Sequence, residues 1–192
     1  LILKFIKTNH SKNFLEALDK NVHSISVIDL LEKIKIFNEQ RLSLHIPKSG
    51  KGFIRKLYST YISYLNKSNF SYGIEDYSDE RGQFSEFVKT QDNGQFSFFT
   101  AKPGISRGNH FHFTKTEKFL VLKGQAEFNF KHIFSNEKYT LKVSDDSLKV
   151  VDSIPLWSHN IVNVGDTDLI VMLWSSEIFD KDNPDTFSYE VG

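Results

Sequence analysis

GISRGNHFHFTKTEKFLVLKG, residues 104–124, combines alternating apolar residues with regularly spaced polar ones. Its first glycine is followed after five residues by His110-Phe-His112, after four more by Glu117, and after six more by its last glycine. In a strand, side chains at positions i and i+2 lie on one face, so His110 and His112 point the same way. Glu117 can return on the next strand after a short turn. The stretch therefore predicts either a metal or catalytic site, or ordinary polar residues on an exposed strand face.

A fourth candidate ligand, His159, lies in IPLWSHNIVN, residues 154–163, where a strand is expected to begin after a proline turn. Three imidazoles and one carboxylate suit Zn, Fe, Mn or Ni and leave coordination positions open for a further ligand. The chain contains no cysteine, so thiolate ligands, disulfides and cysteine nucleophiles are excluded.

From about Phe84 onward the sequence predicts an all-β domain. Short runs rich in Phe, Val, Ile and Thr are separated by turn signals such as DNG, PG, SNE, SDD and VGDTD. Regular short strands with period-two patterning are typical of a sandwich or barrel, not of a parallel α/β sheet. No GxGxxG opens a helix, so no NAD(P) site is predicted in this chain.

The N-terminal third has a different pattern. Residues 24–37 and 53–65 place apolar side chains at helical spacing, and residues 41–46 alternate like a short strand. This region is too small for a large core of its own, so we expect it to pack on something else. The expected organisation is a mainly helical segment over residues 1–65, a polar linker over residues 66–82 and a β domain over residues 83–192.

Composition limits the class of protein further. Among 192 residues, Lys+Arg and Asp+Glu both number 24, so no basic excess points to nucleic acid or to a membrane surface. No apolar run reaches the ~18 residues of a membrane helix, and LILKFIKTNH does not resemble a signal peptide. We therefore expect a cytoplasmic protein. The chain begins with leucine and its one methionine is Met172, which indicates a piece of a longer product or a true start elsewhere.

The spacing in residues 104–124 resembles the first motif of the cupin superfamily at every fixed position, and Pro155–Asn163 resembles the second. Where cupins usually have Pro-x-Gly-x-x-His, Pro155-Leu-Trp-Ser-His159 is one residue shorter and lacks the glycine. The resemblance implies a mainly β fold, the cupin double-stranded β-helix or jelly-roll barrel, preceded by a small helical segment. The metal ligands that it implies are His110, His112, Glu117 and His159.

DERGQFSEFVKT (79–90) and SRGNHFH (106–112) resemble the paired signatures of the dTDP-4-keto-6-deoxyglucose epimerases, which also have a cupin fold. This resemblance implies that Arg107 binds a diphosphate and that His110 is a base. A guanidinium fork suits a diphosphate bidentately, whereas DERG alone reads as a polar turn before a strand. The further substrate-binding candidates are Arg81, Phe84 and Glu86 at the nucleotide, and Trp157 beside His159, for which a core position is the alternative.

From Ser24 to Val191 the chain is similar to the C-terminal part of the bifunctional capsular-polysaccharide enzymes of UDP-N-acetyl-L-fucosamine synthesis. The resemblance rests on stretches such as FIRKLYSTYISYL, GQFSFFTAKPGISRGNHFH and VMLWSSEIFDKDNPDTFSYEV. In those enzymes an NADPH-dependent short-chain reductase domain precedes a zinc-containing cupin that epimerises C3 of a UDP-4-keto-6-deoxy amino sugar. The Rossmann core and the reductase Tyr-x-x-x-Lys are missing here, so residues 1–65 would be only the tail of that domain.

The resemblances imply a zinc-dependent cupin epimerase that acts on a UDP-4-keto-6-deoxy-N-acetylhexosamine and forms a homodimer by strand exchange or sheet stacking. They conflict over His110, and we favour its role as ligand because His112 and Glu117 complete the set. The candidate bases are then His132, Lys118 and Tyr139, although His132 also reads as a core histidine on one strand face with Phe128 and Phe130.

Two other functions stay open. The second reading is that the chain is a non-catalytic fragment of a split bifunctional enzyme, or a subunit that partners a separate reductase. Its leucine start and half-domain suggest this reading. A different metal-cupin activity, such as a dioxygenase or another sugar isomerase, is the third reading.

Overall fold

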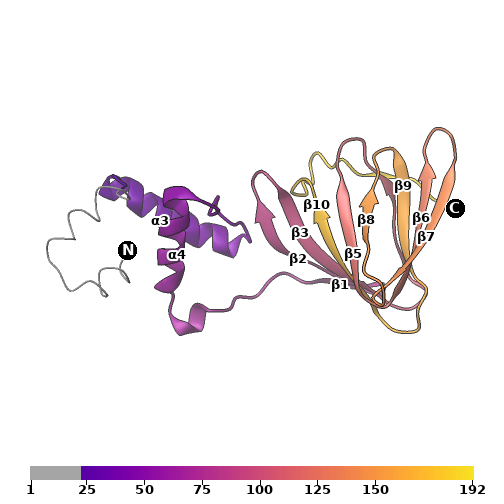
Figure 1. The fold of residues 1–192 in the computed structure, drawn as a ribbon, viewed down its shortest axis with the longest axis horizontal. Coiled ribbons are helices and arrows are strands. Elements are labelled where there is room, and N and C mark those ends of the chain that lie inside the picture. Colours follow the sequence, from indigo (N-terminus) through magenta and orange to yellow (C-terminus); the bar gives the residue numbers. More distant parts are fainter. Residues whose placement is uncertain (1–22) are drawn as a thin grey trace. The chain divides into compact units, whose positions relative to one another are not determined.

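The computed structural model describes residues 23–192. Residues 1–22, the first part of the expected helical segment, lie outside the described residues. The chain divides into two compact units (Figure 1). The smaller unit consists of the residues up to Glu39 together with Lys48–Leu65. The larger unit consists of Gln40–Pro47 and Asn66–Gly192.

The two predicted helices are present as α3, Val27–Leu42, and α4, Gly52–Ser63. Ser26 caps α3, because its Oγ accepts a hydrogen bond from the backbone N–H of Asp29 at 3.0 Å. The one buried side chain of α3 is Phe37, whose ring contacts two tyrosine rings of α4 at centroid distances of 5.2 and 5.8 Å. The two helices are therefore held together by a small aromatic cluster.

The prediction of a short strand over residues 41–46 is wrong. Residues 41 and 42 end α3, and only His45 forms a β-bridge, parallel to Lys89. Leu44 has a φ of 65°, which interrupts an extended chain. The backbone of this segment bonds Lys89 on both sides, at 2.8 Å through Leu44 and at 2.9 Å through Ile46, so it belongs with the larger unit.

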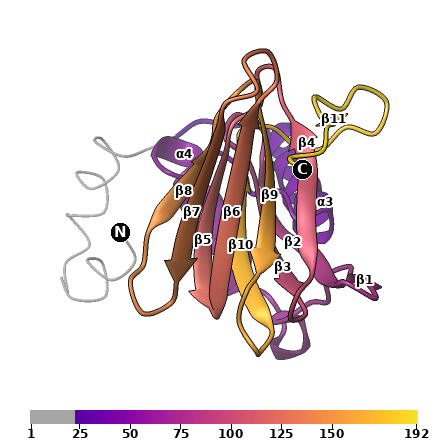
Figure 2. The ribbon, with the colours of Figure 1, turned by 90° about the vertical axis from the view of Figure 1, so that its right-hand side faces the viewer.

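The larger unit contains two antiparallel sheets (Figures 1 and 2). The six-stranded sheet has the order β1-β2-β3-β10-β5-β8. Its strands are β1 (Tyr77–Asp79), β2 (Gly82–Thr90), β3 (Gly94–Ala101), β10 (Leu169–Ser175), β5 (Glu117–Lys123) and β8 (Val150–Ser153). A short 3₁₀ helix, Lys67–Asn69, and β1 lie within the segment expected to be a linker.

The five-stranded sheet has the order β11-β4-β9-β6-β7. Its strands are β11 (Phe187–Ser188), β4 (Ser106–Phe111), β9 (Trp157–Asn163), β6 (Gln125–His132) and β7 (Lys138–Ser144). Figure 2 shows the C-terminal segment with β11 beside β4 at the edge of this sheet. Non-consecutive strands are neighbours in both sheets, as expected for a jelly-roll barrel and not for a simple meander.

Period-two alternation turns one face of each sheet toward a shared core. Phe99, Phe119 and Val171 come from the six-stranded sheet, and Phe128 and Ile161 from the five-stranded one; all are at most 5% exposed. Burying one such side chain contributes about 1.5–3 kcal/mol. The predicted mainly β fold with a preceding small helical segment is confirmed. No helix among residues 23–192 has the length and apolar character needed to cross a membrane.

Candidate metal centre

Four side chains that the sequence predicts as ligands converge inside the barrel. Ligand atoms of His110, His112, Glu117 and His159 all lie within 4.8 Å of one another, and the last three residues are buried. His110 lies in β4, His112 directly follows that strand, Glu117 begins β5 and His159 lies in β9. The cluster therefore joins both sheets. Because His159 is far along the chain from the other three, the barrel topology itself builds this site.

The close approach of β4 to β9 depends on Gly108. This residue has a φ of +113°, and a Cβ there would lie 2.6 Å from the carbonyl oxygen of His159. The ladder shifts its register between Gly108 and His110, after which His110 pairs directly with His159. Directly opposite residues share one face of a sheet. Glycine at position 108 thus allows the two imidazoles to meet, with ring centroids 4.8 Å apart.

The hydrogen bonds of His112 define where its lone pair points. Its Nδ1 lies 2.5 Å from the backbone oxygen of Asp185. A carbonyl oxygen only accepts, so Nδ1 carries the hydrogen and Nε2 has the lone pair in the neutral ring. That Nε2 faces Oε2 of Glu117 at 3.0 Å. Two facing acceptors at this distance require a cation between them, either a proton on Nε2 or a metal ion.

His159 completes this arrangement. Its Nε2 lies 3.5 Å from Oε2 of Glu117, and its Nδ1 is buried without a hydrogen-bond partner among the described residues. The rings of Phe119 and Phe130 lie 5.7 and 6.3 Å from the His159 ring. Apolar rings therefore line one side of the cluster, and this apolar surrounding strengthens electrostatic interactions with any bound cation.

The protonation states suit cation binding. Burial alone raises the pKa of Glu117, but hydrogen bonds and charges from His112 and His159 outweigh it and hold the pKa well below its usual range. Burial, assisted by His159, lowers the pKa of His110 to about 4. A charged carboxylate and a neutral imidazole are the forms that coordinate metals. The donor set of three nitrogens and one oxygen fits a divalent transition metal.

Arg107, the predicted diphosphate ligand, extends from β4 on the face of Ile161, which belongs to the core. Its guanidinium lies 5.5 Å from the Phe99 ring centre, and its side chain is 15% exposed. Among the described residues its buried Nε has no hydrogen-bond partner, and Asp79 is 4.0 Å away from the guanidinium. Burial and the charge of Arg81 lower the pKa of Arg107. Arg107 is therefore a largely buried cation whose charge is only partly compensated, since its guanidinium donates one hydrogen bond of 3.4 Å to the backbone oxygen of Gln83.

The other substrate-binding candidates differ in position. Arg81 is 58% exposed and bonds Asp79 in the β1–β2 turn. Phe84 packs against the core cluster. Glu86 lies opposite a fully buried serine of β3 and forms an ion pair of 2.7 Å with Lys89. Arg81 therefore lies at the surface, whereas Phe84 and Glu86 lie along the inner side of the six-stranded sheet.

Trp157 and His132 pair with each other at one end of the β6–β9 ladder. Their rings are 5.2 Å apart, and Trp157 packs against the core. The Nδ1 of His132 accepts a hydrogen bond of 3.1 Å from the backbone N–H of Ser135. His132 is thus held in a turn next to the tryptophan, which agrees with the core alternative for Trp157 and leaves His132 as a candidate base.

The remaining candidate bases differ in the side of the sheet that they face. Lys118 follows Glu117 on β5 and so faces the opposite side of the sheet, where it forms an ion pair with Asp152. The interpretation of Lys118 as the base is corrected on this ground. Tyr139 lies opposite Phe130 on β7, with ring centroids 6.1 Å apart, and is 56% exposed. Tyr139 therefore lies at the rim of the inner face and remains a candidate base.

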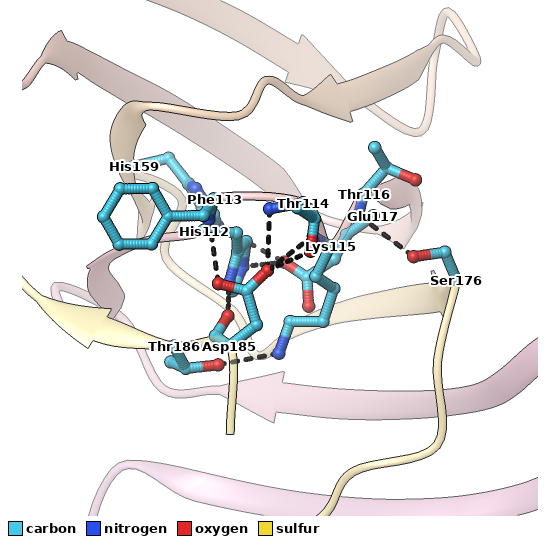
Figure 3. A network of polar contacts seen from close by, with 10 residues as sticks. All are labelled: His112, Phe113, Thr114, Lys115, Thr116, Glu117, His159, Ser176, Asp185 and Thr186. Carbon is cyan, nitrogen blue, oxygen red and sulfur yellow. Dashed lines mark hydrogen bonds and ion pairs between the residues drawn. The ribbon is translucent and has the colours of Figure 1, made fainter. Parts of the chain in front are cut away.

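One contributor to the site was missed. Asp185 accepts hydrogen bonds from the loop that connects His112 to Glu117, as Figure 3 shows. Partial burial alone raises the pKa of Asp185, but the N–H groups of residues 113–115 outweigh it and hold the pKa well below its usual range. Its partners are 70 or more positions away, so no local pattern in the sequence indicates this role.

A jelly-roll barrel of two facing antiparallel sheets, with a histidine–glutamate cluster of cupin spacing in its interior, defines a cupin. The chain belongs to the family described as the polysaccharide biosynthesis C-terminal domain, whose model matches residues 77–187. The predicted resemblance to the C-terminal part of the capsular-polysaccharide enzymes is thereby confirmed.

Similar proteins of known structure or function support this family assignment. The chain is 48% identical over 170 residues to UDP-2-acetamido-2,6-beta-L-arabino-hexul-4-ose reductase of Pseudomonas aeruginosa, covering 88% of this chain and 46% of that protein. It superposes on the capsular polysaccharide assembling protein CapF of Staphylococcus aureus with a TM-score of 0.86 and 43% identity, over 90% of this chain and 50% of that one. CapF with the inhibitor 3-isopropenyl-tropolone matches equally well. The chain thus spans about half the length of these relatives.

Proposed function

We propose that this cupin is a metal-dependent epimerase that inverts C3 of a UDP-4-keto-6-deoxy-N-acetylhexosamine during synthesis of a capsule or O-antigen precursor. The observation that carries the proposal is the buried cluster of His110, His112, Glu117 and His159. The relatives support the substrate class, since one is named for a UDP-linked acetamido-hexulose and another for capsular polysaccharide assembly. Zinc is the metal that the resemblance implies.

The chemistry required is proton removal next to a ketone. The 4-keto group acidifies the C3 hydrogen, and a bound metal supplies Lewis-acid stabilisation of the charge that develops on the carbonyl oxygen. Arg107 binds the diphosphate and so orients the sugar toward the cluster. A base removes the proton and an acid returns one on the other face. His132 and Tyr139 are the remaining candidates for these two tasks.

Solvent exchange tests this function directly. The metal-loaded protein in D₂O is expected to place deuterium at C3 of the 4-keto substrate, because deprotonation and reprotonation occur without reduction. Mass spectrometry and NMR of the recovered sugar measure the incorporation, and chelated protein is the control. If metal-loaded protein leaves C3 protonated, the epimerase proposal fails.

A non-catalytic fragment, or a subunit of a separate reductase, is the second candidate. The observation in its favour is the exposure of apolar side chains on α3: Val27 is 82%, Ile28 70% and Leu31 52% exposed. No described residue of the smaller unit covers them. This reading predicts poor solubility of the chain alone, rescued by co-expression with a Rossmann-fold reductase. Full exchange activity of the isolated chain would argue against a requirement for such a partner.

We also propose that the cupin forms a homodimer by stacking the outer face of its six-stranded sheet. This face has a hollow of about 330 Å³ lined largely by apolar residues, among them Phe96, Leu120, Met172 and Trp174. The outer face of a two-sheet barrel is ordinarily polar, and large exposed apolar patches mark interaction surfaces. A two-fold axis would bring the same face of a second copy against it.

Replacing Met172 with glutamate is expected to convert the dimer to a monomer, because a carboxylate in the centre of an apolar interface loses its solvation. Light scattering coupled to size-exclusion chromatography measures the mass. Phe134→Glu is the control, since Phe134 is 73% exposed on the β6–β7 turn of the other sheet. A wild-type monomer would contradict the dimer, and a dimeric Met172→Glu variant would contradict this face.

A further inference from the structure

The loop between His112 and Glu117 is held by one carboxylate from a distant part of the chain. Oδ1 of Asp185 accepts a hydrogen bond from the N–H of Phe113 at 2.9 Å. Its Oδ2 accepts three more, from the N–H and Oγ1 of Thr114 at 2.7 and 2.8 Å and from the N–H of Lys115 at 2.8 Å. Figure 3 shows these donors pointing at a single side chain.

The main chain of the same residue contacts a metal-ligand candidate. The backbone oxygen of Asp185 accepts from Nδ1 of His112 at 2.5 Å. This bond fixes both the tautomer and the rotation of the imidazole, so that Nε2 points at Glu117. Asp185 thus uses its side chain to hold the loop and its carbonyl to orient the ring at the start of that loop.

Neighbouring residues hold this segment in place. Lys115 is 7% exposed, and its Nζ donates to Oγ1 of Thr186 at 2.7 Å. Phe187 pairs with Phe111 in the β11–β4 ladder, with the two rings stacked at 5.4 Å, and Ser188 pairs with His110. The segment that carries Asp185 is therefore continuous with a strand bonded to β4, and its position is coupled to that of the ligands.

We propose that Asp185 is a positioning residue for the metal centre, which sets the geometry of His112 and Glu117. This inference rests on the proposed metal site. A metal-bound histidine is oriented by the acceptor of its other N–H, and loss of such a partner costs about 10- to 100-fold in metal affinity. A purely structural turn cap would affect stability but leave the ligand geometry of the folded protein unchanged.

The experiment measures metal binding in Asp185→Ala and Asp185→Asn. The amide of the second variant is not equivalent to the carboxylate, because its NH₂ group faces donors where Asp185 offers only acceptors. Zn²⁺ affinity is measured by chelator competition, and Co²⁺ is used for its visible absorption, which reports ligand geometry. We expect Zn²⁺ affinity to fall by about 10-fold in Asp185→Ala, at the lower end of the range for disturbed partners of metal-bound histidines. This variant keeps the carbonyl that accepts from His112 Nδ1 but releases the loop bonds that hold this carbonyl in place. A smaller loss is expected in Asp185→Asn, and an altered Co²⁺ spectrum in both.

Asp145→Ala is the matched control. The carboxylate of Asp145 accepts a hydrogen bond of 3.0 Å from the N–H of Gly124, so this variant also removes an aspartate that caps a backbone donor of the barrel. Its Zn²⁺ affinity and Co²⁺ spectrum are expected to match those of the wild type. Thermal unfolding of all the proteins separates stability from ligand geometry.

The outcomes distinguish the two proposals. A wild-type protein that binds no Zn²⁺ or Co²⁺ would overturn the metal centre itself. Wild-type affinity and spectrum in folded Asp185→Ala or Asp185→Asn would overturn only the positioning role. If Asp185→Ala does not fold, the Asp185→Asn variant and the NMR signal of the His112 Nδ1–H decide, since this proton is expected to lie downfield in the wild type and to shift in the variant.

Discussion

Replacing Glu117 with glutamine is expected to remove the bound metal and to lower the rate of C3 hydrogen exchange by about 100- to 1000-fold. Glutamine has the same size, and its NH₂ can donate to Nε2 of His112, where the carboxylate now faces that atom at 3.0 Å. This hydrogen bond would satisfy both buried side chains, so no cation is needed between them. The barrel is retained, but the one anionic ligand among three imidazoles is lost. Elemental analysis of the purified protein and deuterium incorporation measure the two effects.

Glu127→Gln is the control for this substitution. Glu127 lies on β6 and is 3.6 Å from Lys142 in an ion pair of the five-stranded sheet. The same chemical change there is expected to alter neither metal content nor exchange. Full C3 exchange by metal-free Glu117→Gln would show that the reaction does not depend on the metal centre.

The convergence of the four candidate ligands was predictable because each of them depends on a short-range rule or on a recognised spacing. His110 and His112 share a face by strand geometry, and Glu117 returns after a turn of four residues. His159 was less certain from its own motif, which lacks the usual glycine. The structure shows that Leu156 adopts a φ of 68° in that turn, and its N–H donates to the carbonyl oxygen of His112 at 2.8 Å. A leucine thus takes a left-handed conformation, at a cost of about 1–2 kcal/mol.

The same rules could have excluded Lys118, since it is adjacent to Glu117 on one strand and must face the other way. These local rules could not predict the role of Asp185. Its hydrogen-bond partners lie 70 or more positions earlier, and the pairing exists only because β11 joins the edge of β4. The short strand predicted over residues 41–46 failed for a related reason, because one bridge to Lys89 replaces a regular ladder there.

Arg107→Ala is expected to weaken binding of UDP by about 100-fold, and Arg107→Lys by about 10-fold. Each charge-assisted hydrogen bond to a phosphate is worth about 1.5–3 kcal/mol, and lysine keeps the charge but not the bidentate fork. In the structure the guanidinium is nearly buried, its Nε has no partner among the described residues, and its contact with Asp79 is long at 4.0 Å. An incoming diphosphate would complete the compensation of this charge. Isothermal titration calorimetry with UDP measures the affinity.

Arg81→Ala is the matched control, because Arg81 is the neighbouring arginine but is 58% exposed and bonded to Asp79. Water and salt screen the charge of an exposed arginine strongly, so this variant is expected to reduce UDP affinity less than Arg107→Ala does. Raising the salt concentration should weaken any contribution of Arg81 more than that of Arg107, since buried charges are less screened. Unchanged UDP affinity in Arg107→Ala would contradict the assignment of the diphosphate to this residue. An equal loss in both variants would instead place the diphosphate between the two arginines, at the surface of the β1–β2 turn.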